Sequence, residues 1–284
     1  AEWDHMWTKV WNIAGRESEL EEPGDFLVHD LCQESIIAVR QTDGTVRAFY
    51  NACPHRGNRL AWGSGNVSAF TCSYHAWCWG TDGVLQSIPD PEDFQGGDPS
   101  GQISLKELPC DNWGGFIWYN MDENAPPLLE YLDPTAELYE NYDLAGMVRV
   151  AWRRVEINAN WKFSCDNFSE SYHVPIVHPQ VGSSIEDDYS NCAYEMFPKG
   201  HNRIVMPGHP STRPPPLGEA EALAVDPMRG PWAEMLRAWG LNRADYADDR
   251  DGANEARLDL QQQRRKLGPA RGYNHYEKLA DEQL

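Results

Sequence analysis

The chain reads Cys53-Pro54-His55-Arg56-Gly57 and then Cys72-Ser73-Tyr74-His75, with sixteen residues between His55 and Cys72. Each stretch supplies one cysteine and one histidine, spaced as C-x-H in the first and as C-x-x-H in the second. Two thiolates and two imidazoles make one metal site. Such a ligand set can hold a zinc ion tetrahedrally, or a two-iron cluster in which two imidazoles replace two thiolates on one iron.

The residues around the two stretches favour the cluster over zinc. Pro54 and Gly57 stiffen and turn the first loop, and bulky side chains flank the second loop, namely Tyr74, Trp77 and Trp79. Apolar surface of this kind keeps water away from a redox centre, and zinc fingers rarely carry it. The sequence therefore predicts an iron-sulfur site, with a structural zinc site as the alternative.

At this point the chain resembles the Rieske iron-sulfur proteins, whose two ligand loops have this form and about this separation. The match extends to Arg56-Gly57 and to His75-Ala76-Trp77. The resemblance implies a 2Fe-2S Rieske cluster held by Cys53, His55, Cys72 and His75. Ala76 departs from the family pattern, which usually has glycine there, and is expected to alter backbone donation to the cluster.

A second group of residues lies between positions 160 and 179. It comprises Asn160-Trp161-Lys162, Asn167-Phe168-Ser169-Glu170-Ser171-Tyr172-His173 and His178-Pro179. If residues 161–173 are helical, Asn167, Glu170 and His173 recur three residues apart and project from one face. Pro175 then breaks the helix and lets His178 fold back. Two imidazoles and one carboxylate around an iron with open positions are typical of non-haem Fe(II) oxygenases.

Together the two groups resemble the large (alpha) oxygenase subunit of the Rieske non-haem iron oxygenases, in the aromatic-ring-hydroxylating dioxygenase family. The resemblance implies that His173 and His178 bind a mononuclear Fe(II). It also implies a third ligand, an Asp or Glu further along the chain, which the sequence leaves unassigned. The acidic residues nearest to the histidine pair read as part of a solvated loop; they are Asp187, Asp188 and Glu195.

Two more residues receive roles from the resemblance. In the family, a carboxylate three residues before the first iron-binding histidine links that histidine to a cluster histidine of the neighbouring subunit in a head-to-tail trimer. Glu170 has this position relative to His173, and its partner would be the neighbouring subunit's His75. Asn167 is a candidate for orienting a ligand water, with a surface position on a helix as the alternative.

The activity that the resemblance implies is that of a terminal oxygenase. A reductase, a ferredoxin or both would deliver electrons, and the iron would use them with O2 to hydroxylate an aromatic or other hydrophobic organic substrate. The alternative is a monooxygenase or demethylase acting on an amine or ether such as carnitine or betaine. Glu170 favours this alternative, because ring dioxygenases usually have Asp there, whereas Glu occurs in members that act on quaternary amines.

A second alternative is a Rieske electron-transfer protein without oxygenase activity. It would explain the unassigned third ligand, but it would leave the placement of His173 and His178 unexplained. The assembly expected from the resemblance is a homotrimer, with or without a small beta subunit.

Length and composition fit an enzyme of two domains. The chain has 284 residues, a hydrophobic share of 41% and a formal net charge of −20 at pH 7. This charge argues against nucleic acid or an anionic membrane as a partner. Seven cysteines in a chain of this length do not form a disulfide framework, and no apolar run or leader pattern stands out, so a cytoplasmic protein is expected.

The predicted fold class is α+β, with an all-β Rieske domain beside a helix-grip-like catalytic domain that has a curved antiparallel sheet. The predicted divisions are an N-terminal part that packs on the catalytic domain (residues 1–37), the Rieske domain (residues 38–150), and a catalytic domain expected to be incomplete at its C-terminus (residues 151–284).

The sequence also predicts particular elements within these divisions. Residues 34–40 and 45–50 are joined through Asp43-Gly44 and indicate a β-hairpin. Residues 147–157 read as a strand that returns the chain to the second domain. Residues 207–218 contain five prolines and indicate an irregular loop, and helices are expected near residues 231–240 and 254–266.

Overall fold

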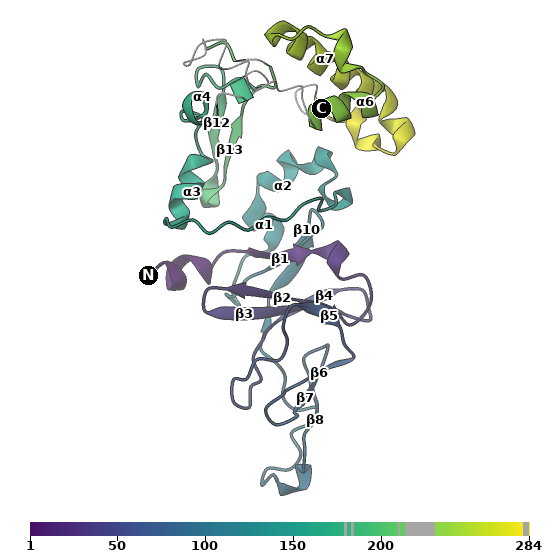
Figure 1. Ribbon diagram of the computed structural model, residues 1–284. Coiled ribbons are helices and arrows are strands. Elements are labelled where there is room, and N and C mark those ends of the chain that lie inside the picture. Colours follow the sequence, from purple (N-terminus) through teal and green to yellow (C-terminus); the bar gives the residue numbers. More distant parts are fainter. Residues whose placement is uncertain (179–180, 183–184, 210, 214–230, 281–283) are drawn as a thin grey trace. The chain divides into compact units, whose positions relative to one another are not determined.

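The computed structural model describes residues 1–178, 181–182, 185–209, 211–213, 231–280 and 284 (Figure 1). The chain divides into two compact units. The first unit contains residues 1–136 and 143–148, and the second contains residues 137–142 and 149–284.

A five-stranded antiparallel sheet is the largest element of the first unit. Its spatial order is β5 (Ser64–Asn66), β2 (Asp25–Leu31), β3 (Glu34–Arg40), β4 (Val46–Tyr50) and β9 (Glu107–Leu108). The central strand β3 has four consecutive residues, Ile36 to Val39, that are 0% exposed, so both of its faces are covered. The predicted hairpin is confirmed, since β3 pairs with β4 and Gly44 takes the left-handed conformation that the tight turn requires (φ +84°).

Two three-stranded sheets complete the first unit. One has the order β1 (Asn12–Arg16), β11 (Phe116–Tyr119) and β10 (Cys110–Trp113). The other has the order β6 (Ala69–Thr71), β7 (Cys78–Gly80) and β8 (Leu85–Ser87). A single hydrophobic core joins this second sheet to the five-stranded sheet, because Phe49 of β4 and Trp79 of β7 pack in the same cluster as Cys53 and Cys72.

Short helical segments fill the rest of the first unit. They are a π-helix at Trp3–Trp7, α1 at Leu128–Leu132, and 3-10 turns at Glu17–Glu19, Pro91–Asp93 and Leu144–Gly146. Residues 1–37 contribute β1, β2 and part of β3 to this unit. The domain boundaries drawn from the sequence, after residues 37 and 150, stay predictions.

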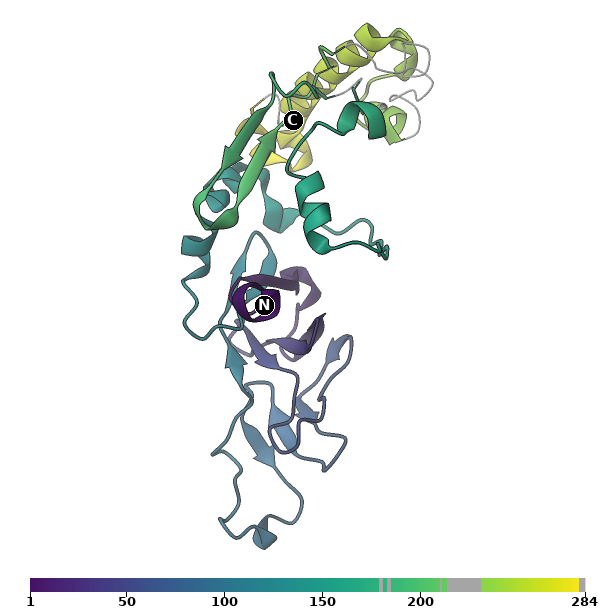
Figure 2. The ribbon, with the colours of Figure 1, turned by 90° about the vertical axis from the view of Figure 1, so that its left-hand side faces the viewer.

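The second unit mixes helices with one antiparallel hairpin. Its elements are α2 (Thr135–Leu138, which crosses the division between the units), α3 (Trp161–Asn167), α4 (Val174–Val177), β12 (Ala193–Met196), β13 (Asn202–Val205), α6 (Pro231–Ala238) and α7 (Arg250–Leu267). 3-10 turns lie at Glu140–Tyr142, Pro198–Gly200, Arg243–Asp245, Pro269–Arg271 and Asn274–Glu277. Figure 2 shows β12 and β13 side by side, as their pairing requires.

The two predicted C-terminal helices are confirmed by α6 and α7. They share a small core in which Leu236 and Trp239 meet Ala256 and Leu260. Of the loop predicted over residues 207–218, position 210 and positions 214–218 lie outside the described residues.

The strand predicted over residues 147–157 is wrong for the described part of the chain. A strand requires a neighbour for its backbone hydrogen bonds, and no described segment pairs with this one. Its alternating apolar side chains are exposed, with 77% of Val148, 93% of Val150 and 76% of Trp152 open to solvent. Apolar and polar residues do alternate along this segment, as in a half-buried strand. The described residues, however, do not cover its apolar side chains.

Candidate functional site: a paired Cys/His centre and a histidine pair

The first ligand loop follows β4 and folds into a tight turn. The Gly57 N–H donates to the Cys53 carbonyl at 2.8 Å, and the Cys53 N–H donates to the Asn58 carbonyl at 2.8 Å. Gly57 has a φ of +73°, which a residue with a side chain rarely adopts. This turn fixes the backbone between the cysteine and the histidine of the C-x-H motif.

The second ligand loop connects β6 to β7 and is built in the same way. The Cys72 N–H donates to the Trp77 carbonyl at 2.8 Å, and the Ala76 N–H donates to the Cys72 carbonyl at 2.9 Å. Ala76 takes a φ of +57°, a left-handed conformation that costs an L-residue about 1–2 kcal/mol. The local fold thus explains in physical terms why glycine suits this position better than alanine.

The structure brings the predicted cluster ligands together in pairs, Cys53 with Cys72 in one core cluster and His55 with His75 beside each other. Cys53 and Cys72 are almost completely buried, at 1% and 3% exposure, whereas His55 is exposed and His75 is half-buried. The two imidazole rings lie 4.7 Å apart between centroids. The ring of Trp77 stacks on His55 at 4.5 Å and 4°.

The pKa shifts of three of these four groups differ in direction. Burial raises the pKa of the Cys53 thiol. Burial acts in the same direction on Cys72, but the backbone N–H groups of Tyr74 and His75 outweigh it and lower the pKa of that thiol. Partial removal from water lowers the pKa of His55, and the nearby His75 lowers it further. A lower pKa favours the neutral imidazole that a metal requires.

The histidine pair of the second unit is arranged differently from the sequence prediction. Asn160 caps the start of helix α3, because its side chain accepts a hydrogen bond from the Lys162 N–H at 3.1 Å. The helix ends at Asn167 instead of continuing to His173. Pro175 lies in the first turn of α4, where it is tolerated, so the expectation that it breaks the helix is wrong. Asn167 and Glu170 therefore do not share a helical face with His173.

A turn between α3 and α4 nevertheless brings Glu170 onto His173. The Glu170 carboxylate accepts a hydrogen bond from the backbone N–H of His173 at 3.1 Å and contacts its Nδ1 at 2.5 Å. The hydrogen bonds from His173 outweigh partial burial and lower the pKa of Glu170. When Nδ1 carries the proton, Nε2 presents its lone pair to a metal. The ring of His178 lies 5.4 Å away at 76°, so two imidazoles are available at one place.

The remaining predicted site residues are only partly placed. Asn167 is half-buried at the last position of α3, and its role in orienting a water stays a prediction. Within the described residues, no three side chains among His, Cys, Asp and Glu converge on one metal position. The third iron ligand therefore stays unassigned.

The three acidic residues considered for that ligand are engaged elsewhere. Asp187 accepts a hydrogen bond from Ser211 and is 3% exposed, so its interpretation as part of a solvated loop is wrong. Asp188 accepts hydrogen bonds from the backbone N–H and hydroxyl of Ser190. Glu195 forms an ion pair with Arg203 at 2.5 Å.

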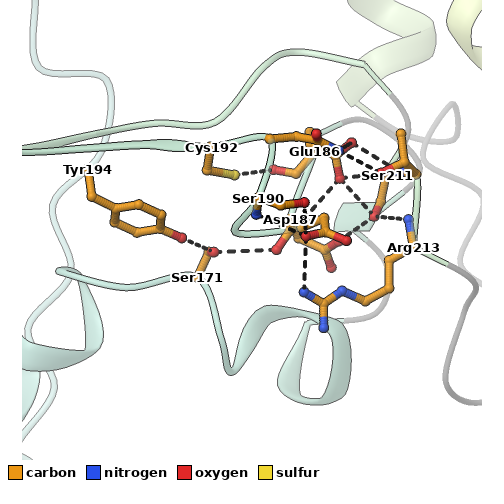
Figure 3. Close-up of polar contacts among 11 residues, drawn as sticks. Ser171, Glu186, Asp187, Ser190, Cys192, Tyr194, Ser211 and Arg213 are labelled. Carbon is orange, nitrogen blue, oxygen red and sulfur yellow. Dashed lines mark hydrogen bonds and ion pairs between the residues drawn. The ribbon is translucent and has the colours of Figure 1, made fainter.

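A buried hydrogen-bond network next to Glu170 was not predicted from the sequence (Figure 3). Ser171, which is 0% exposed, contacts the Tyr194 hydroxyl at 2.5 Å and the Asp187 carbonyl at 3.4 Å. Glu186, also 0% exposed, accepts hydrogen bonds from the backbone N–H groups of Asp188 and Thr212. This network anchors Ser171, the residue that follows Glu170. The acidic sequence from Glu186 to Asp188 did not indicate a buried network.

We expect Glu186→Gln to lower the free energy of unfolding by about 2 kcal/mol at pH 7, because hydrogen bonds to a buried charge are lost. Burial raises the pKa of Glu186, but the donated hydrogen bonds outweigh it and lower the pKa from 4.5 to about 2. A depressed pKa stabilises the folded state above pH 4.5, and this contribution is lost as the pH falls toward 2.

Urea denaturation of both proteins between pH 7 and pH 2 measures this difference. The two unfolding free energies should converge at the acid end. A constant difference across that range would contradict the assignment.

Comparison with known proteins now identifies the class to which this fold and these sites belong. Residues 10–109 match the Rieske (2Fe-2S) domain, and residues 144–242 match the catalytic domain of the ring hydroxylating alpha subunit. The chain therefore combines a Rieske 2Fe-2S domain with the catalytic domain of the ring hydroxylating alpha subunits. The resemblance drawn from the ligand loops is confirmed, as are the fold class and the two cofactors at the level of these domains.

Individual relatives fall into two groups. The carnitine monooxygenase oxygenase subunit of Acinetobacter baumannii is 36% identical over 186 residues, which are 64% of this chain and 50% of that protein. The large oxygenase component of the naphthalene 1,2-dioxygenase system of Pseudomonas putida is 34% identical over 195 residues, which are 66% of this chain and 43% of that protein. The chain thus spans about half the length of the curated relatives that it matches.

Solved structures give the same two groups. A quaternary ammonium Rieske monooxygenase is matched with a TM-score of 0.62 and 33% identity over 69% of this chain and 54% of the other. Naphthalene 1,2-dioxygenase with indole bound is matched with a TM-score of 0.58 and 34% identity over 64% of this chain and 42% of the other. None of the described helices combines the length and apolar character that a membrane span requires.

Proposed function

We propose that this chain acts as the terminal oxygenase of a Rieske oxygenase system. One observation carries the proposal: the Glu170 carboxylate holds Nδ1 of His173 and leaves Nε2 free beside the ring of His178. A Rieske protein that only transfers electrons has no use for this second centre.

The buried thiols and the two imidazoles fit a 2Fe-2S cluster held by Cys53, His55, Cys72 and His75. The histidine pair fits a mononuclear Fe(II) held by His173 and His178. When bound, these groups supply electron storage and activation of O2 beside an organic substrate. The Trp77 ring covers one face of His55 and restricts access of water to it. Glu170 fixes the tautomer and the orientation of His173.

We also propose that Glu170 connects the two kinds of site between neighbouring copies of the chain. A carboxylate offers about four lone-pair positions, and His173 uses two of them. The remaining positions can accept the ring N–H of the neighbouring subunit's His75. A heterologous contact of this kind closes into a ring, which favours the homotrimer. A similar protein, the quaternary ammonium monooxygenase, is described in terms of inter-subunit electron transfer.

For the substrate we propose an aromatic or other hydrophobic compound that is hydroxylated. Similarity to naphthalene 1,2-dioxygenase supports this class. A second candidate is a quaternary amine, favoured by similarity to carnitine monooxygenase and by Glu, not Asp, at position 170. Incubation of the iron-loaded protein with a reductase, O2 and either naphthalene or carnitine, followed by product analysis, separates the two classes.

The electron-transfer alternative is tested in the same assay. The proposed function requires O2 consumption that depends on an organic substrate and yields an oxygenated product. Reduction and reoxidation of the cluster without a product from a broad panel of both substrate classes would overturn the proposal.

We expect the purified protein to be brown and to contain a 2Fe-2S cluster whose reduced form shows the low average g-value of mixed thiolate and imidazole ligation. His55→Cys should lower the reduction potential if a cluster assembles, because thiolate donates more charge than imidazole. Iron, zinc and sulfide analysis with electron paramagnetic resonance (EPR) measures this. A colourless protein with stoichiometric zinc would refute the cluster assignment.

A further inference from the structure

Trp79 carries a buried donor without an acceptor. It is 0% exposed, and its indole nitrogen has no hydrogen-bond partner among the described residues. A tryptophan has a single polar hydrogen, so this side chain leaves its whole hydrogen-bonding capacity unused. Other tryptophans of the same unit behave normally, since Trp11 donates to the Pro126 carbonyl at 3.0 Å and Trp118 donates to the Trp113 carbonyl at 3.2 Å.

The position of Trp79 directs this donor at the first ligand loop. Side chains two residues apart on a strand point to the same face, so Trp77 and Trp79 lie on one side of the segment that enters β7. Trp77 stacks on His55, and Trp79 shares a core cluster with Cys53 and Cys72. The two rings are 6.1 Å apart. Trp77 therefore covers one ligand of the C-x-H motif, and Trp79 lies in the core cluster that contains the other.

The side chain of Trp79 lies within reach of the Cys53 thiol. A thiol is a weak acceptor, which explains why the indole N–H forms no regular hydrogen bond with it. A thiolate bound to iron is a stronger acceptor at the same place.

We propose that the indole N–H of Trp79 donates a hydrogen bond to the Cys53 sulfur when that sulfur ligates the cluster, and that it raises the reduction potential. This rests on the cluster of the proposed function. Reduction adds one electron from a one-electron donor, breaks no bond and leaves the proton on Trp79. Reduction would make the cluster more negative, so a hydrogen bond to one of its sulfurs would stabilise the reduced form more than the oxidised form.

The test compares reduction potentials of cluster-loaded proteins by potentiometric titration followed by EPR. We expect Trp79→Phe to reduce the equilibrium constant for reduction about tenfold, a drop of about 59 mV for a one-electron couple. Trp11→Phe is the matched control, because it also removes a buried indole N–H from the first unit, but from a different core cluster. Its potential should equal that of the unchanged protein.

If Trp79→Phe fails to assemble a cluster, the hydrogen bond is tested in the unchanged protein instead. Labelling its tryptophans with indole ¹⁵N should give a hyperfine coupling to the reduced cluster, and the coupling should persist in Trp77→Phe, which removes the other indole next to a ligand. Equal potentials in Trp79→Phe and Trp11→Phe, or the absence of that ¹⁵N coupling, would overturn the inference. A protein that binds no cluster at all would instead refute the proposed function.

Discussion

Replacing His173 with alanine is expected to remove about one iron per chain and to abolish product formation, while the spectrum of the cluster stays unchanged. The reason is that this site has few ligands to lose. At this position the described residues supply only the imidazoles of His173 and His178, and no third ligand joins them. Loss of a group that merely orients a ligand costs about ten- to hundredfold in metal affinity, and loss of a ligand itself should cost at least the upper end of that range.

Metal analysis and single-turnover product yield measure this effect. His178→Ala should behave in the same way, since both rings belong to one site. His201→Ala is the matched control in the same unit and should retain iron and activity. Full iron content in His173→Ala, or continued hydroxylation, would show that the histidine pair is not the iron site.

Replacing Glu170 with glutamine should slow electron delivery between the centres by about ten- to hundredfold. Glutamine is nearly isosteric, but its single oxygen carries no charge. It therefore cannot both hold Nδ1 of His173, as the carboxylate does at 2.5 Å, and accept the N–H of the neighbouring subunit's His75. The reduction potential should change little, because the ligands of the cluster are not altered. Iron is supplied in excess, since losing a group that orients His173 costs about ten- to hundredfold in metal affinity.

Stopped-flow measurement of cluster oxidation in a single turnover tests the bridge. Glu195→Gln is the control, since it removes a carboxylate of the same unit that pairs with Arg203. An unchanged rate in Glu170→Gln, or a monomer with full activity, would mean that the carboxylate does not connect the copies.

The two loops proposed to hold the cluster could be predicted from the sequence, because each loop is local. Cys53 and His55 lie in one turn, and Cys72 and His75 lie in another, so their spacing already contains the geometry. The strands that support them followed from Asp43-Gly44 and its flanking β-branched residues.

The closeness of His173 and His178 could be predicted from the sequence, but the conformation of the segment that carries them could not. The sequence between Trp161 and His173 permits a continuous helix, and its end at Asn167 depends on contacts with distant residues. Ser171 is buried because Tyr194 and Asp187 are folded over it, and local pattern does not encode such contacts. The sequence from Glu186 to Asp188 suggested a solvated loop because its hydrogen-bond donors are not its immediate neighbours. They come from residues 190, 191, 211 and 212.

The contrast between the buried cysteines and the more accessible histidines has a consequence for biosynthesis. Cys53 and Cys72 lie inside the core of the first unit, so iron and sulfide must reach the thiols before that core closes. The imidazoles of His55 and His75 lie outside it and can coordinate afterwards. Maturation is therefore expected to be ordered, and chelators or oxidants should dismantle the cluster from its imidazole side first.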